Sequence, residues 1–198
     1  MSIEHAGHSG AATAGFAADE AIMLRVRAGE TGLLAELFER HNRPVFGFFY
    51  RMTSSRELSE DLVQDVFLRI LRYRDTYQPR TSFAAWMYGI ARNAMIDQMR
   101  KRRPESSLDD AMAEVPTRDE PADERMRARQ ESEILQRALS SLPADKREVL
   151  ILARYQDLRY EEIGRILGCE PNAVKQRVFR AVKALGDRYT ELSGRVAQ

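Results

Sequence analysis

The sequence predicts an all-α protein with two small helical domains joined by a flexible acidic linker, the second domain containing a helix-turn-helix. Apolar residues recur at the three-to-four spacing of helices in both halves of the chain. Between the halves lies a stretch with many acidic residues, three prolines and few large apolar side chains. The 198 residues are enough for two modest hydrophobic cores.

These features divide the chain into four segments. Residues 1–18 are rich in Ala, Gly and Ser and are predicted to form a disordered tail. Residues 19–103 form the first helical domain, and residues 104–131 form the linker. Residues 132–192 form the second domain.

The clearest helix of the first domain spans residues 57–73. Its apolar stripe, at helical spacing, comprises Leu58, Leu62, Val63, Val66, Phe67, Ile70 and Leu71. The opposite face carries Asp61, Gln64, Asp65, Leu68 and Arg72. The pattern alone favours solvent for this face, but acidic groups and an amide around an exposed leucine also suit docking of a basic partner.

A second helix, from Ser82 to about Arg102, has polar groups beside its apolar stripe. At about 100° per residue, one face combines Trp86, Ile90, Asn93, Ala94 and Asp97. Either the polar pair is satisfied within the core, or Asn93 lies at a rim where a ligand or an unstacked base can reach it. Residues 73–83 mix aromatic and basic side chains, a composition that suits stacking of single-stranded nucleic acid.

Charge is unevenly distributed although the net charge is only +1. Residues 72–103 contain eight basic and two acidic side chains, a local charge of +6. Residues 104–133 contain ten acidic side chains and four arginines, a local charge of −6. The pattern indicates an acidic tether between two basic modules.

The second domain contains a tight turn between two helices. Gly168 stands where a helix ends, and Pro171 stands in the first turn of the next helix. The last helix is predicted to dock through Val174, Val178, Ala181, Val182 and Leu185. Its outward face then carries Asn172, Gln176, Phe179, Arg180 and Lys183, residue types that suit the DNA major groove.

Other classes of function find little support. The single cysteine, Cys169, excludes an intramolecular disulfide and a cysteine-rich zinc site. We expect no metal, no cofactor and no enzymatic activity, because no catalytic constellation is present. No apolar run approaches the roughly 18 residues of a membrane span, so we expect a cytoplasmic protein without membrane insertion. The alternatives are a stand-alone helix-turn-helix regulator that binds duplex operators and an adaptor that binds only proteins.

Four segments, in order, closely resemble the extracytoplasmic-function group of bacterial RNA polymerase sigma factors, within the sigma-70 family. They are AELFERHNRPVFGFFYRM, EDLVQDVFLRIL, SFAAWMYGIARNAMIDQMRKRR and LPADKREVL…YEEIGRILGCEPNAVKQRVFRAV. The resemblance covers nearly all of residues 22–190. It implies a non-catalytic factor that binds core polymerase, recognises minus-35 and minus-10 promoter elements, and promotes DNA melting.

The resemblance assigns roles to the two domains and their partners. The first domain would bind polymerase through the clamp helices of β′ and would recognise and melt the minus-10 element. The second domain would recognise the minus-35 element, and the β flap of polymerase is a further expected contact. The linker resembles the segment that threads the RNA exit path, and such factors are often held inactive by an anti-sigma factor.

The resemblance also assigns individual residues. Polymerase contacts would be made by Asp61, Gln64, Asp65 and Leu68. The minus-10 site would combine the loop residues Tyr73, Arg74, Asp75, Thr76 and Tyr77 with Asn93 as a base-capturing pocket, and with the phosphate-binding residues Arg92, Arg100, Lys101 and Arg102. The minus-35 element would be contacted by Asn172, Lys175, Gln176, Arg177, Phe179 and Arg180.

Some positions depart from the group. Asn172 and Ala173 replace a frequent Gly-Thr, and Gln176 replaces the usual Ser. The loop has Pro79 and Arg80 where Gly and an acidic residue are frequent. We therefore expect promoter preferences that differ from the common ones.

Overall fold

The computed structural model describes residues 9–102, 122–156 and 158–196, and these residues are helical almost throughout. The first part comprises α1 (Ser9–Arg27), the short 3₁₀ turn η1 (Thr31–Leu33), α2 (Leu34–Thr53), α3 (Arg56–Arg72), η2 (Arg74–Thr76) and α4 (Phe83–Arg102). The second part comprises α5 (Ala122–Ser140), α6 (Ala144–Tyr155), α7 (Tyr160–Leu167) and α8 (Pro171–Val196). The all-α prediction is confirmed.

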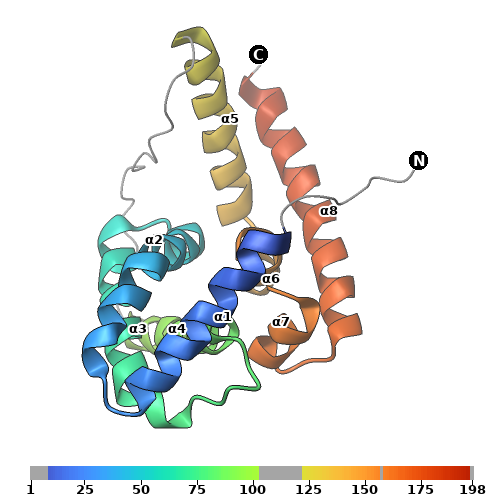
Figure 1. Cartoon of the computed structure of the whole chain (residues 1–198). Helices are drawn as coiled ribbons and strands as arrows, with labels where there is room; N and C mark the ends of the chain where they lie inside the picture. The colour runs from blue at the N-terminus through green and yellow to red at the C-terminus, as the bar shows by residue number, and fades with distance from the viewer. Residues whose placement is uncertain (1–8, 103–121, 157, 197–198) are drawn as a thin grey trace.

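Helices α1 to α4 form the first bundle (Figure 1). The corner between α2 and α3 is built by two serines. Ser54 takes a left-handed conformation (φ 57°) that ends α2, and the Ser55 side chain accepts a hydrogen bond from the Leu58 amide at 3.3 Å. The predicted stripe of α3 then enters the core, with Val66 and Ile70 fully buried, while Leu71 is only partly buried.

Two helices begin earlier than the sequence predicts. Helix α1 starts at Ser9, inside the tail for which we predicted disorder, and α5 starts at Ala122, inside the predicted linker. In α5, the apolar residues Ile134, Ala138 and Leu139 are buried. Once such packing has nucleated a helix, extending it into the preceding polar residues costs little free energy, because each added residue gains a hydrogen bond. The remaining tail (1–8) and linker (104–121) residues lie outside the described part of the chain.

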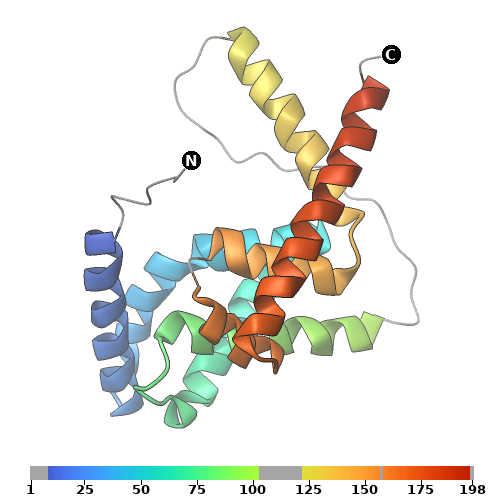
Figure 2. The ribbon, with the colours of Figure 1, turned by 90° about the vertical axis from the view of Figure 1, so that its right-hand side faces the viewer.

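Helices α6 and α7 lie against the first bundle, with α6 beside α2 and α7 beside α4, and α5 also contacts α2 (Figures 1 and 2). Helix α8 packs on α5, α6 and α7. Helices α5 and α8 project from the same side of the molecule and diverge toward their far ends (Figure 2). The sequence did not predict this contact between domains. Buried apolar residues of both parts belong to one hydrophobic cluster. The polar contacts between the parts include Arg147 with the Met52 carbonyl, Arg92 with Glu148, Ser82 with Glu162, Tyr88 with Gln156, and Arg51 with the Tyr155 ring.

The long helix α8 docks through part of its predicted stripe. Val174, Val178 and Ala181 are buried, whereas Val182 is 42% exposed, so the prediction was wrong for that residue. Val182 lies about 100° around the helix from the buried Ala181, on the exposed side of α8.

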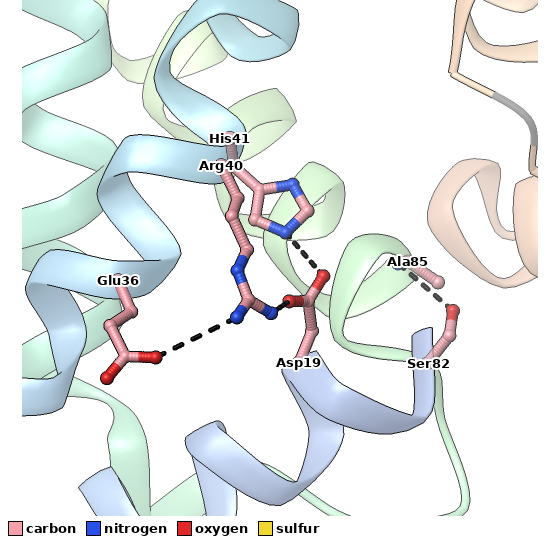
Figure 3. Close-up of polar contacts among 6 residues, drawn as sticks. All are labelled: Asp19, Glu36, Arg40, His41, Ser82 and Ala85. Atoms are coloured by element: carbon pink, nitrogen blue, oxygen red, sulfur yellow. Dashed lines mark hydrogen bonds and ion pairs between the residues drawn. The ribbon is translucent and has the colours of Figure 1, made fainter. Parts of the chain in front are cut away.

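A buried carboxylate attaches α1 to α2 (Figure 3). Asp19 accepts a hydrogen bond from Arg40 Nη1 at 2.7 Å and lies 2.7 Å from His41 Nε2. Burial raises the pKa of Asp19, but hydrogen bonds and charge attraction from His41 and Arg40 outweigh burial and hold it below its usual value of 3.8. Asp19 is therefore ionised in the folded protein, and its charge stabilises the docking of α1.

Substitution Asp19→Asn is expected to lower the free energy of unfolding near neutral pH by about 1–2 kcal/mol, because charge-assisted hydrogen bonds are lost. A depressed pKa stabilises the fold above the unfolded value of 3.8, and this contribution disappears as pH falls through the folded pKa. Urea unfolding at several pH values should therefore show the two proteins converging below pH 3.8. A difference that stays constant down to that range would contradict this account of Asp19.

Candidate polymerase and promoter surfaces

The outward face of α3 is an exposed surface with acidic, amide and apolar groups. Asp61 and Gln64 are exposed, Asp65 is partly exposed, and Leu68 is 67% exposed. Helix α3 holds these four side chains in a row because residues three and four apart share a face. The structure brings all four predicted polymerase contacts onto one surface. We refer to Asp61, Gln64, Asp65 and Leu68 as the α3 face.

The loop after α3 is fixed by local hydrogen bonds. Thr76 Oγ1 donates to the Tyr73 carbonyl at 2.8 Å, and Arg74 Nη1 donates to the Leu71 carbonyl at 2.9 Å. The side chains of Asp75 and Thr76 are exposed. The loop thus has a defined shape before any ligand binds.

Tyr77 differs from the rest of the predicted minus-10 loop because its side chain is fully buried. Its ring packs against Trp86 at a centroid distance of 5.3 Å, and its hydroxyl donates to the Thr81 carbonyl at 3.2 Å. Burial, with the nearby charges of Glu20 and Asp19, raises the pKa of Tyr77 to about 12. Arg27 of α1 also donates to the Tyr77 carbonyl at 3.0 Å. Tyr77 therefore anchors the loop rather than presenting a stacking surface.

A surface cavity of about 410 Å³ lies between the end of α3 and the middle of α4. Tyr73, which is 42% exposed, and the exposed Asn93 are both on its wall. Arg100 also borders the cavity. The sequence left open whether Asn93 belongs to a core network or to a rim, and the structure places it at the rim. The remaining lining residues are Arg69, Ile90, Ile96 and Asp97.

Arg69 is a residue of this site that the sequence analysis missed. Its Nε atom lies 2.9 Å from Asp65 Oδ2, and its Nη1 atom lies 2.7 Å from Asp97 Oδ2. Burial lowers the pKa of Arg69, but its hydrogen bonds to Asp97 and Asp65 outweigh burial and raise it. The hydrogen bond from Arg69 lowers the pKa of Asp97. The i,i+4 spacing of Asp65 and Arg69 was the available sequence signal.

Arg92 is not among the residues that line the cavity. Its Nε atom is 3.0 Å from Glu148 Oε1 of α6, and the Arg92 side chain is 31% exposed. Burial raises the pKa of Glu148, and the charge of Arg92 opposes that shift. The predicted phosphate-binding residues Arg100 and Lys101 are exposed at the end of α4. The structure thus leaves Arg100 and Lys101 accessible but pairs Arg92 with the second domain.

The turn between α7 and α8 has the geometry of a helix-turn-helix. Gly168 has φ 66° and ends α7, as its position predicted. Gly164 permits close approach of the turn, because a Cβ atom there would lie 2.5 Å from the Cys169 carbonyl oxygen. This close packing fixes how α8 leaves the domain.

The first turns of α8 present the predicted recognition residues together. Phe179 is 69% exposed. The other members of the set are also exposed: Asn172, Lys175, Gln176, Arg177 and Arg180. The surface combines amide and cationic groups around one aromatic ring, and we call these six residues the recognition surface.

Across the described ranges, no group of three or more His, Cys, Asp or Glu side chains is placed to hold a metal ion. Among the described helices, none is both long and apolar enough to cross a membrane.

Both halves of the chain match families of the sigma-70 class of promoter-recognition subunits. The sigma-70 region 2 family matches residues 37–105, and the sigma-70 region 4 family matches residues 132–185. The RNA polymerase sigma factor CarQ of Myxococcus xanthus is 34% identical over 89% of this chain and 100% of its own length. The ECF RNA polymerase sigma-E factor of Escherichia coli K12 is 28% identical over 88% of this chain and 95% of its own length.

Solved structures agree with this assignment. The chain matches the sigma factor RpoE of Bartonella quintana, solved in complex with the anti-sigma factor NepR, with a TM-score of 0.66, 27% identity, and coverage of 79% of this chain and 96% of that one. CnrH, solved with the cytosolic domain of CnrY, shares the fold with a TM-score of 0.66 at 24% identity over 86% and 96% of the chains. The protein belongs to the extracytoplasmic-function group of sigma factors. It is a non-catalytic subunit that directs RNA polymerase to promoters.

Proposed function

We propose that the α3 face binds the clamp helices of the polymerase β′ subunit. Its exposed leucine supplies apolar contact area, and Asp61 and Asp65 supply charge for a basic partner. The face lies on a single rigid helix whose opposite side is buried in the core. Such a surface can dock without rearranging the first domain.

We propose that the cavity beside Tyr73 and Asn93 captures a base flipped out of the minus-10 element. The single observation that carries this proposal is that Tyr73 and Asn93, twenty residues apart in sequence, line the same cavity as Arg100. An aromatic ring can stack on a base, an amide can hydrogen-bond its edge, and a guanidinium can neutralise its phosphate. Asp75 and Thr76 would contact flanking nucleotides, and Arg74 and Tyr77 would hold the loop in place.

The recognition surface of α8 is proposed to contact the minus-35 element in the major groove. Gln176 and Asn172 offer amides for base edges, while Lys175, Arg177 and Arg180 offer charge for guanine or phosphate. Phe179 offers an apolar contact for a thymine methyl group. Support comes from the shared exposure of the six side chains.

We further propose that the two domains separate when the factor acts. The minus-10 and minus-35 elements lie about 25 base pairs apart, or about 85 Å along a duplex at about 3.4 Å per base pair. In this structure α7 packs directly on α4, and Arg92 forms an ion pair with Glu148. Separation would release Arg92 to hold a promoter phosphate, as the sequence comparison with the group implies.

The remaining partners follow from the family. An anti-sigma factor is proposed to hold this chain inactive, because RpoE of Bartonella quintana was solved with the anti-sigma factor NepR. The second domain is proposed to contact the β flap, and the linker to enter the RNA exit path. A factor with these partners acts in the cytoplasm, where polymerase and the chromosome lie.

Run-off transcription from a genomic promoter library tests these roles, using core polymerase with and without the protein. We expect Asp61→Ala/Asp65→Ala to lower transcript yield at least tenfold at limiting polymerase, and excess polymerase to restore it, because binding alone is weakened. We expect Asn93→Ala to lower yield several-fold even at saturating polymerase. A template with an unpaired minus-10 region should partly restore Asn93→Ala, because the cost of unpairing the bases is removed.

The matched control is Asp187→Ala/Glu191→Ala, which also removes two carboxylates but lies on α8, away from the α3 face. Its yield should stay within about twofold of the original protein at all polymerase concentrations, since it lacks the α3-face change. Equal loss in both double variants would refute the proposed polymerase surface. Protection of discrete duplex sites by the protein alone, without polymerase-dependent transcripts, would instead favour a stand-alone regulator.

A further inference from the structure

Arg69 connects two surfaces to which the proposed function gives different partners. Asp65 belongs to the α3 face. Asp97 lines the cavity beside Tyr73 and Asn93, which we call the minus-10 cavity. One guanidinium reaches both carboxylates, at 2.9 Å and 2.7 Å.

The three side chains differ in accessibility. Arg69 is 21% exposed, whereas Asp65 is 42% and Asp97 is 43% exposed. Each carboxylate is therefore open to an incoming ligand, while the guanidinium between them is largely covered. A ligand can change the pairing of Arg69 without removing Arg69 from its position.

Arg69 compensates a negative charge on the cavity wall, that of Asp97. A nucleotide brings a phosphate, and the Asp97 carboxylate on the cavity wall would repel it. Arg69 neutralises Asp97, but in the free protein Arg69 also forms an ion pair with Asp65. Its positive charge is thus divided between the two carboxylates.

We propose that Arg69 is a positioning residue that couples polymerase docking to capture of the minus-10 strand. The inference rests on the proposed roles of the α3 face and the cavity. When a basic group of polymerase pairs with Asp65, Arg69 transfers its interaction to Asp97. The cavity then carries less negative charge and binds the DNA strand more tightly than it does in the free factor.

The decisive substitution is Asp65→Asn. It imitates the docked state because it removes the ion pair between residue 65 and Arg69. The probe is a fluorescent single strand carrying the minus-10 region of a promoter found by run-off transcription. It is titrated with the full chain, without polymerase, at constant low salt, and anisotropy is measured. We expect Asp65→Asn to bind the strand about three- to tenfold more tightly than the original protein.

Two comparisons separate this coupling from a general change in charge. Glu60→Gln removes one carboxylate from the same helix and breaks a similar i,i+4 pair, with Arg56 at 2.9 Å, but has no link to the cavity. It should change strand affinity by less than twofold. In an Arg69→Gln background, Asp65→Asn should give no gain in affinity.

A third comparison tests the charge on the cavity wall. Arg69→Gln alone should weaken strand binding, and Arg69→Gln/Asp97→Asn should recover most of the loss, because no uncompensated carboxylate remains. Thermal unfolding checks that each variant is folded. If Arg69→Gln does not fold, Arg69→Lys replaces it, since a lysine keeps the charge but lacks the fork that reaches both carboxylates.

The outcomes are distinct. Equal gains from Asp65→Asn and Glu60→Gln, or a gain from Asp65→Asn that persists without Arg69, would overturn the coupling while leaving the cavity assignment intact. Failure of the assembled holoenzyme to bind the strand would overturn both. Failure of every polymerase-free protein, Asp65→Asn included, would overturn the coupling alone.

Discussion

Substitution Arg147→Ala is expected to lower the free energy of unfolding by about 3 kcal/mol, because three partly buried carbonyl groups lose their charged donor. Arg147 donates to the Met52 carbonyl at 2.6 Å, to the Leu142 carbonyl at 3.0 Å, and to the Ser140 carbonyl. These acceptors lie at the end of α2 and at the corner between α5 and α6. One side chain thus joins both domains and shapes that corner.

The placement of Arg147 suits helix electrostatics. Met52 lies in the last turn of α2, where unpaired carbonyls carry partial negative charge, and a guanidinium there is favourable. Burial lowers the pKa of Arg147. An arginine remains charged even so, because its ordinary pKa is above 12.

Urea unfolding and limited proteolysis check the Arg147 prediction. The control is Arg154→Ala, also on α6 but exposed, which should change stability by less than about 0.5 kcal/mol. Arg147→Ala should also speed cleavage at the corner between α5 and α6, where two of the Arg147 hydrogen bonds lie. Equal unfolding midpoints and cleavage rates for the two variants would show that the Arg147 contacts contribute nothing to domain packing.

Substitution Gly164→Ala is expected to destabilise the second domain by about 2 kcal/mol or more, as overpacking of a tight site does. The added Cβ atom would lie 2.5 Å from the Cys169 carbonyl oxygen and 3.7 Å from the Pro171 nitrogen. The nearest atom belongs to backbone, so the turn itself must move. Movement of the turn tilts α8, and we expect transcription from minus-35-dependent promoters to fall together with stability.

The matched control is Gly186→Ala in α8 of the same domain. No atom lies within 4 Å of a Cβ built there, so alanine should be neutral or stabilise the helix by up to about 1 kcal/mol. Thermal unfolding with helicity as the signal compares the two variants. A Gly164→Ala protein as stable as the Gly186→Ala protein would mean that the turn tolerates the displacement.

Local sequence patterns predicted the elements whose structure depends on local physics. The stripe of α3, the turn at Gly168 and the exposed row of α8 follow from helical periodicity and from the backbone preference of glycine. Asn93 was left between two interpretations because periodicity cannot tell a rim from a core. Only the neighbouring loop with Tyr73 decides that question, and its position depends on tertiary packing.

The contacts that the sequence did not predict join residues far apart along the chain. Arg147 pairs with a carbonyl group of residue 52, and Arg92 pairs with Glu148. A backbone carbonyl has no sequence signature, and an arginine paired across domains resembles any solvated arginine. For the same reason Tyr77 was grouped with its loop neighbours although its ring is buried.

The contact between the domains leaves one of the two proposed DNA-binding surfaces accessible and covers part of the other. Phe179 and its neighbours on α8 are exposed in the closed arrangement, whereas Arg92 is held by Glu148. We therefore expect a fixed order of events on DNA: duplex can be sampled by α8 at once, whereas full engagement of the opened strand waits for the domains to part. Inspection of many sites would then be fast and reversible, and commitment to one of them would be the slow step.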